Sequence, residues 1–278
     1  LTGSYVPPDK DRFKKLVHNE LNRAENKLTV LQKEAVEAEN AEEYRIKADN
    51  LMTYQYSLQD HADKEITVSD IYSTEGAQLT IALDQRVSIN QNIQSYYHKY
   101  NKLKRAQELL KQQLAECQGN IRYLASIETS LIASTSLAEI ADIRAELISS
   151  GYLREKLKKK PSEKPSQPFK FTAPDGTQIL VGKNNYQNDR LTFKIAQYND
   201  IWLHTKDIPG SHVILRCGGS EPAEETLSLA ASLAAHFSQA AGSSNIPVDY
   251  TACRYVKKPS GSKPGFVIFT NQKTLYVT

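Results

Sequence analysis

The sequence predicts an α+β protein, in which a long antiparallel coiled-coil arm with a small α/β tip precedes a compact mixed α+β domain. Small or apolar residues recur at heptad spacing in the first half, as in paired helices. Short β-branched runs bounded by turn residues alternate with a few helical segments in the second half, as in α+β domains. We place the arm at 1–150, its tip at about 39–99, a basic proline-rich linker at 151–168 and the α+β domain at 169–278.

Two heptad seams predict the arm. Steps of four and three alternate along the first seam, which comprises Val17, Leu21, Ala24, Leu28, Leu31, Ala35 and Ala38. The second seam comprises Tyr100, Leu103, Leu110, Leu114, Cys117, Ile121, Leu124 and Leu131, with Gln107 and Glu128 in two broken positions. Two such helices joined by a tip would lie antiparallel.

The alternative is that the seams are the core faces of an ordinary helical bundle, which requires a third helix. Only the segment SLAEIADIRAELISSG remains for that purpose, and it starts with a capping box formed by Ser136 and Glu139. In the tip, Glu75 and Gly76 separate two β-branched runs and predict a β-hairpin.

Composition and charge limit the classes of function. No apolar run is long enough to span a bilayer. The three cysteines are far apart and lack CxxC spacing, so neither a zinc site nor a disulfide framework is predicted. Residues 151–278 hold 17 Lys and Arg against 10 Asp and Glu, a balance of +7, which leaves −4 for 1–150. This asymmetry points to a polyanionic partner for the basic half.

The linker and the domain after it have distinct patterns. LREKLKKKPSEKPSQP cannot form a core, and its Lys158, Lys159 and Lys160 either keep a tether solvated or contact phosphate. FKFTAPDGTQILVG predicts a strand, a turn and a strand, and NNYQNDRLTFKIA predicts a short helix. A longer helix is predicted from about Glu221 to Ala241, and strands are predicted in VDYTACRYV, FVIFT and TLYVT.

The segment DIWLHTKDIPGSHVILR, residues 200–216, predicts two strands with Pro209 and Gly210 in a type II turn, where glycine takes a positive φ. Side chains alternate between the two faces of a strand. One row therefore holds Asp200, Trp202, His204, His212 and Arg216, and the opposite aliphatic row of Ile201, Leu203, Val213 and Leu215 belongs in the core.

Several interpretations of the polar row compete. A metal site lacks a third strong ligand nearby. Ser211 and His212 cannot act as a nucleophile and its base, because neighbours on a strand point to opposite faces. An exposed recognition face for bases or phosphate fits these side chains. The remaining alternative is that Trp202 fills the core and that the histidines bond to buried carbonyl groups.

The predicted binding residues are basic, aromatic or imidazole side chains from the hairpin and from the loop KKPSGSKPG. They are Asp200, Trp202, His204, Lys206, His212, Arg216, Lys257, Lys258 and Lys263. We expect no catalytic residues, no metal and no cofactor. The alternative is that KKPSGSKPG is a mobile turn whose charged lysines only keep it solvated.

These motifs carry a family resemblance. DIWLHTKDIPGSHVILR followed by KKPSGSKPGFVIFTNQKTLYVT resembles the C-terminal RNA-binding-type module of the NFACT family, and YYHKYNKLKRAQ resembles its coiled-coil middle region. The resemblance covers essentially the whole chain. The N-terminal domain of the family, where its principal tRNA contacts lie, has no counterpart in this sequence.

The resemblance implies a non-enzymatic role in ribosome quality control. Proteins of this kind bind the large ribosomal subunit and tRNA, and they promote C-terminal alanine tailing of stalled chains in the cytoplasm. Some members are also described as surface proteins that bind fibronectin or fibrinogen, and both descriptions can apply to one protein. An adhesin at the cell surface is therefore the alternative function, and the two differ in the salt dependence expected of binding.

Overall fold

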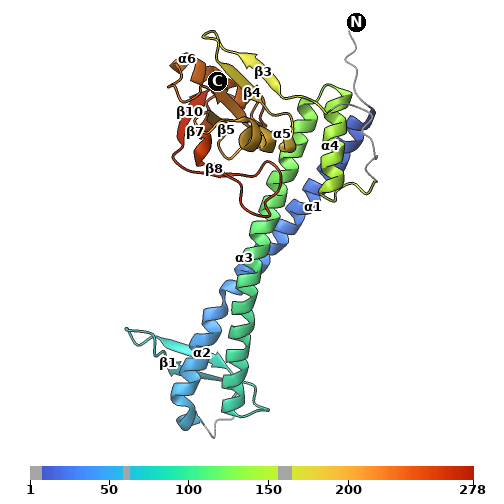
Figure 1. Cartoon of the computed structure of the whole chain (residues 1–278). Coiled ribbons are helices and arrows are strands. Elements are labelled where there is room, and N and C mark those ends of the chain that lie inside the picture. Colours follow the sequence, from blue (N-terminus) through green and yellow to red (C-terminus); the bar gives the residue numbers. More distant parts are fainter. Residues whose placement is uncertain (1–7, 59–62, 156–164) are drawn as a thin grey trace. The chain divides into compact units, whose positions relative to one another are not determined.

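The structure, a computed structural model, describes residues 8–58, 63–155 and 165–278 (Figure 1). A long helical region is followed by a β-sheet domain, so the predicted α+β class is confirmed. The chain divides into two compact units. Residues 25–118 form the first, which we call the hairpin unit, and residues 1–24 with 119–278 form the second, the sheet unit. Residues 1–24 and 119–150, the two ends of the helical region, thus group with the sheet. This division differs from the predicted boundary between arm and linker at residue 150.

The hairpin unit is built from helices and one pair of strands. It contains the end of α1 (Pro8–Glu39), α2 (Ala41–Tyr54), the 3-10 turn η1 (Gln55–Leu58), β1 (Glu65–Ser69), β2 (Gln78–Ala82) and the start of α3 (Ile89–Ala133). The predicted β-hairpin is present, because β1 and β2 pair antiparallel with Thr67 opposite Thr80. Gly76 has a φ of 73° in the connecting turn, a conformation that glycine adopts without strain.

The helices of the hairpin unit run antiparallel. Gln107 Nε2 on α3 donates a hydrogen bond to the carbonyl oxygen of Ala38. Lys104, three residues before Gln107, forms an ion pair of 3.0 Å with Glu42, four residues after Ala38. Supercoiling of these helices stays a prediction. A small apolar core fills the tip, with Tyr96 packed against it.

Three helices form an apolar core in the sheet unit. The contributing residues are Phe13, Val17 and Leu21 of α1, Leu124, Ile127 and Leu131 of α3, and Ile140, Ile143 and Leu147 of α4 (Leu137–Ser149). The third helix begins at the predicted capping box, in which Ser136 and Glu139 cap each other's backbone N–H groups. In this unit the seams are therefore core faces of a small bundle, the alternative that the sequence left open.

A six-stranded antiparallel sheet follows, in the order β10-β7-β5-β6-β4-β3. Its strands are β3 (Phe169–Thr172), β4 (Gln178–Val181), β5 (Ile201–Thr205), β6 (Val213–Arg216), β7 (Ile246–Ala252) and β10 (Lys273–Val277). Helix α6 (Glu224–His236) covers one face with small residues, so it can lie close to the strands.

The other face of the sheet is covered by short elements. They are α5 (Asn185–Arg190), the π-helical turn η2 (Leu191–Ile195), the 3-10 turn η3 (Cys253–Tyr255) and the small pair β8 (Val256–Lys257) and β9 (Ile268–Phe269). Leu191, Val256 and Phe269 from these elements pack against Trp202 and Ile214 of the sheet. Both faces of the central strands are therefore covered.

Two local predictions in this domain are wrong. Helix α6 is shorter than the predicted span of 221–241, because the chain leaves the helix at Phe237 and forms a bridge between Ser238 and Gly210. Gly210 does not have a positive φ, so the type II turn is not formed. A Cβ at this position would lie 2.8 Å from the Cβ of Ser238 and 2.9 Å from Thr205 Oγ1, so the turn needs glycine for close approach.

Candidate nucleic-acid interface

The two predicted strands of residues 200–216 are present as β5 and β6, and they pair antiparallel. Trp202 lies opposite Ile214, and Leu203 lies opposite Val213. The aliphatic row packs beneath α6, as predicted. At the loop end of the hairpin the rings of His204 and His212 meet edge to face, with centroids 5.6 Å apart.

The prediction that the opposite row faces outward is wrong for three of its five residues, whereas His204 and Arg216 are partly exposed. The exposed fractions of Trp202 and Asp200 are 0% and that of His212 is 2%. The covering elements are η2, β8 and β9, on the face away from α6. Alternation along a strand identifies residues that share a face, but it does not show whether later segments cover that face. Stacking of Trp202 on an RNA base is therefore excluded in this conformation.

Asp200 acts as an anchor for three loops. Its carboxylate pairs at 2.9 Å with Arg216 and accepts hydrogen bonds from the N–H groups of Gln197 and Gly218. Its carbonyl oxygen accepts a hydrogen bond of 2.8 Å from the N–H of Cys253. A buried carboxylate requires such partners, so the role of Asp200 in this conformation is to hold loops in place.

His212 is neutral and bound at both ring nitrogens. Its Nε2 lies 3.1 Å from the carbonyl oxygen of Gly265, which can only accept, so Nε2 carries the proton. Nδ1 then accepts from the hydroxyl of Thr192 at 2.8 Å. Burial lowers the pKa of His212 well below its ordinary value and also lowers the pKa of His204. The interpretation that the histidines bond buried groups holds for His212.

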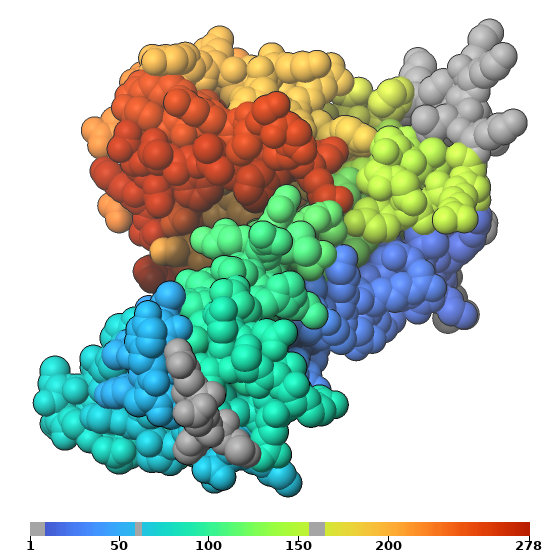
Figure 2. Space-filling model, turned by 90° about the horizontal axis from the view of Figure 1, so that it is seen from below, coloured from blue at the N-terminus to red at the C-terminus, as the bar shows by residue number. Residues whose placement is uncertain are grey.

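The predicted lysines have different surroundings. Lys206 and Lys257 are exposed. Lys258 forms an ion pair with Asp189. The ammonium group of Lys263 lies 4.8 Å from the ring centroid of Tyr123 and 5.6 Å from that of Tyr152. The loop therefore ties the sheet domain to helices of its own unit, and Figure 2 shows the red C-terminal segment against green and yellow-green helical residues. Lys158, Lys159 and Lys160 lie outside the described residues.

Sequence reasoning missed a cluster of aromatic rings around an exposed cation. The guanidinium carbon of Arg254 lies 4.8 Å from the ring centroid of Tyr255 and 5.7 Å from that of Tyr198. Arg254 Nη1 donates a hydrogen bond of 2.5 Å to Asn199 Oδ1. Arg254 and Tyr255 are adjacent in the sequence, but Tyr198 and Asn199 are far from them, so only the tertiary structure assembles the cluster.

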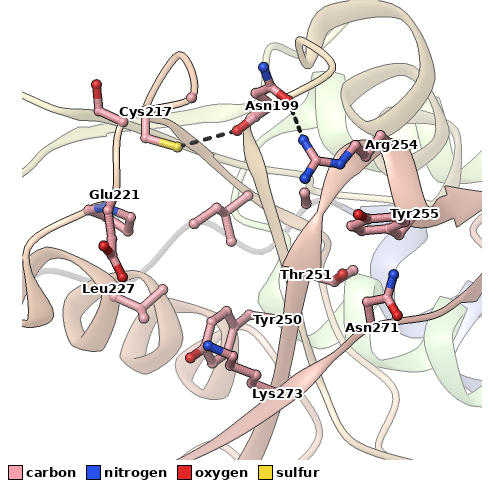
Figure 3. A pocket seen from close by; sticks show the side chains of 15 residues that line it. Asn199, Cys217, Glu221, Leu227, Tyr250, Thr251, Arg254, Tyr255, Asn271 and Lys273 are labelled. Carbon is pink, nitrogen blue, oxygen red and sulfur yellow. Dashed lines mark hydrogen bonds between the residues drawn. The ribbon is translucent and has the colours of Figure 1, made fainter.

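An open cleft lies beside this cluster, at the end of the sheet where α6 begins (Figure 3). Its volume is about 510 Å³. The lining residues are Asn199, Ile201, Cys217, Gly219, Ser220, Glu221, Pro222, Leu227, Tyr250, Thr251, Ala252, Arg254, Tyr255, Asn271 and Lys273. The neighbouring guanidinium of Arg254 lowers the pKa of the Tyr255 hydroxyl. The cleft thus combines cations, aromatic rings and an apolar floor.

Two family models match the chain and identify its family. Residues 6–166 match the family model described as NFACT N-terminal and middle domains, and residues 167–271 match the model described as NFACT protein RNA binding domain. The chain belongs to the NFACT family. The second match begins close to the predicted start of the α+β domain at 169, and it includes the hairpin, the Arg254 cluster and most of the cleft.

Curated NFACT relatives are similar over nearly the whole chain. The "Rqc2 homolog RqcH" of Bacillus subtilis is 42% identical over 273 residues, which are 97% of this chain and 47% of that protein. The protein of the same name from Streptococcus pneumoniae serotype 2 is 41% identical over 263 residues, 94% of this chain and 47% of its own length. The chain therefore spans about half the length of the curated relatives that it matches.

A solved NFACT structure has the same fold. It is the C-terminal part of the fibronectin/fibrinogen-binding protein from Streptococcus suis, which matches with a TM-score of 0.75 and 38% identity, covering 97% of this chain and 93% of that one. Within the described ranges, no helix is long and apolar enough to cross a membrane. Nor do the residues described here include a group of three or more His, Cys, Asp and Glu side chains that could hold a metal ion.

Proposed function

We propose that the chain is the RNA-contacting part of a ribosome quality control factor. In this proposal it binds the large ribosomal subunit and tRNA and promotes C-terminal alanine tailing of stalled nascent chains. The single observation that carries the proposal is the match of residues 167–271 to an RNA-binding domain. The relatives named RqcH, similar over nearly all of this chain, support it.

The physical properties of the sheet unit are compatible with an RNA partner. Cations fixed against aromatic rings, as Arg254 is between Tyr198 and Tyr255, are groups that bind phosphate and stack on bases. The +7 balance of residues 151–278 also favours a polyanion. The loop contacts of Lys263 with helical residues would transmit the position of the helices to the RNA-binding surface.

We propose that the chain acts by binding and not by catalysis. The ribosome would perform the peptide transfer, and the chain would position RNA beside it. The buried polar row then serves stability, since Asp200 and His212 are engaged by backbone and side-chain partners. A ribosomal partner also places the proposed activity in the cytoplasm.

Sedimentation with purified large subunits tests this function. The 278-residue chain should co-sediment with large subunits that carry peptidyl-tRNA, and binding should weaken steeply as salt rises, because phosphate contacts release counterions. Crosslinking in cells should then recover tRNA and large-subunit RNA. The proposal would be refuted if the chain does not co-sediment with large subunits at low salt and if crosslinking in cells recovers no RNA.

Adhesion is the second candidate function, favoured by one observation. The similar solved structure comes from a protein named for binding fibronectin and fibrinogen. If this chain does the same, it should bind immobilised fibronectin saturably at physiological salt. A folded protein of equal net charge is the control, and binding no greater than that of the control would remove this candidate.

A further inference from the structure

We propose that the cleft beside Arg254 binds one unpaired nucleotide of single-stranded RNA. The base would lie on the apolar floor, and the phosphates that flank it in the strand would lie at Arg254 and at Lys273, at opposite ends of the cleft (Figure 3). This inference rests on the proposed RNA partner, and it adds where RNA binds and that the bound RNA is single-stranded. The predicted face at Trp202 and His212 would not be the contact surface.

The floor of the cleft is apolar sheet surface that no helix covers. Helix α6 begins at Glu224, and its first apolar residue over the sheet, Leu227, lines one side of the cleft. Ile201 and Tyr250 are therefore only partly buried, whereas Leu203 further under the helix is fully buried. A planar base can cover such a surface and gain the free energy of removing apolar area from water.

Arg254 is oriented in advance for a phosphate. Its guanidinium is held by the hydrogen bond to Asn199 and by the rings of Tyr198 and Tyr255, yet the residue is exposed. A planar guanidinium has five N–H donors, so those not bonded to Asn199 remain for a ligand. A group already held in place loses less conformational entropy when it binds.

A second cation lies on the neighbouring strand. Lys273 at the start of β10 is opposite Tyr250 of β7 in the sheet register, and it is exposed. It lines the cleft together with Arg254, which follows β7 directly. Figure 3 shows Tyr250 and Lys273 at one end of the cleft and Arg254 at the other, with open space between them. A nucleotide within a strand can thus be bound at its base and at the phosphate on each side of it.

The size and charge of the cleft favour this ligand over others. A volume of about 510 Å³ lies in the range of pockets for small ligands and does not admit a base-paired duplex. Glu221 lines the cleft with Arg254 and Lys273, so the two cations are partly offset by a carboxylate. An acidic peptide would bring further carboxylates close to Glu221, whereas a nucleotide presents its phosphates to the two cations and an uncharged base to the floor.

Binding of a labelled ten-nucleotide RNA to the 278-residue chain tests the site. The single strand should bind more tightly than a ten-base-pair RNA duplex at equal salt. Arg254→Ala and Tyr255→Leu should each weaken single-strand binding about tenfold, since each removes a stacking or phosphate contact. Lys273→Ala should lower the slope of log affinity against log salt by about 0.7, the value for one phosphate of a single strand.

The matched control is Lys170→Ala. Lys170 is an exposed lysine on β3, at the opposite edge of the sheet from β10, so its removal changes the net charge equally but does not touch the cleft. Its affinity for single-stranded RNA should equal that of the unaltered chain. Thermal melting of every variant establishes that it is folded, and Arg254→Lys replaces the alanine variant if that one unfolds.

Photocrosslinking locates the RNA without any substitution. RNA that contains 4-thiouridine should crosslink to the unaltered chain within residues 250–255. If the chain binds RNA but the crosslinks lie elsewhere and the three variants bind normally, the cleft assignment fails while the RNA-binding function stands. If the chain binds no RNA, both fail. If an acidic ten-residue peptide added before irradiation prevents the crosslink at concentrations where unlabelled RNA does not, the cleft is assigned to a protein ligand instead.

Discussion

The carboxylate of fully buried Asp200 lies 2.9 Å from the guanidinium of Arg216 and joins the start of β5 to the end of β6. The same carboxylate accepts hydrogen bonds from the backbone N–H groups of Gln197 and Gly218. These contacts hold the loops that contain Asn199 and Cys217, two residues that line the cleft. The buried carboxylate of Asp200 thus stabilises two of the loops that line the cleft.

Replacement of Asp200 should destabilise the domain. Asp200→Ala leaves the N–H groups of two loops unpaired and removes the partner of Arg216, which should lower the free energy of unfolding by roughly 2–4 kcal/mol. Urea unfolding of Asp200→Ala and of the unaltered chain measures this change in the free energy of unfolding. Lys206→Ala is the control, because Lys206 is exposed and its removal should change the free energy by less than about 0.5 kcal/mol. Equal stability of the two variants would contradict the anchoring role.

Trp202 should behave as a core residue. Trp202→Ala should lower the free energy of unfolding by about 3–5 kcal/mol, as for other large side chains deleted from a core. Trp202→Phe should cost much less, because the indole Nε1 is buried without a hydrogen-bond partner and its loss breaks no bond. Calorimetry of both variants checks this order. RNA binding lost without any loss of stability would restore the exposed-face prediction.

Buried His212 and partly buried His204 should make the sheet domain sensitive to acid. The pKa of His212 lies well below its value in the unfolded chain, and that of His204 is also lowered, so the unfolded state takes up protons first. Stability from these residues is therefore present above about pH 6.5 and is lost as the pH falls below it. Urea unfolding between pH 5 and 7.5 measures the slope. Between pH 5 and pH 7.5 the free energy of unfolding should change less in the positive direction in His212→Gln than in the unaltered chain, because all other titrating groups contribute equally to both. An equal change in the two proteins would exclude His212 as a cause.

Glu146 should produce the opposite pH dependence. This carboxyl on α4 is buried, and burial raises its pKa to about 7, so above pH 4.5 the unfolded state releases the proton first. Stability is therefore lost as the pH rises from about 4.5 to 7, on the order of 3 kcal/mol in all. Glu146→Gln keeps the oxygen that accepts from Tyr123 and Asn185 and should remove this loss. Unfolding measured at pH 5 and pH 8 compares the two proteins, and lower stability of the glutamine variant at pH 8 would contradict the prediction.

Two glycines of the C-terminal loop provide a matched pair. Gly261 and Gly265 both have positive φ, but a Cβ at Gly261 meets nothing, whereas one at Gly265 would lie 2.4 Å from Asn185 Oδ1. Gly261→Ala should cost about 1 kcal/mol of stability, from backbone strain alone. Gly265→Ala should cost clearly more and should increase hydrogen exchange in the loop. Equal effects would show that the loop does not depend on its contact with α5.

Local patterns determined much of the fold. The alternation of residues along 200–216 predicts the pairing of β5 with β6, because the period of a strand equals two residues and the intervening turn is short. The Ser136 capping box predicts the start of α4, since both partners lie within one turn of each other. Such features depend on neighbours in the chain, so the sequence alone suffices to find them.

Burial and the candidate site were decided by the tertiary structure. Trp202 and His212 are buried because segments around 191 and 256–269 return to cover a face whose polar residues suggested exposure. The cleft depends likewise on Asn199, Glu221, Tyr250 and Arg254, which come from three separate parts of the chain. Whether a face is open or covered depends on where distant segments pack, and spacing along one strand carries no record of those segments.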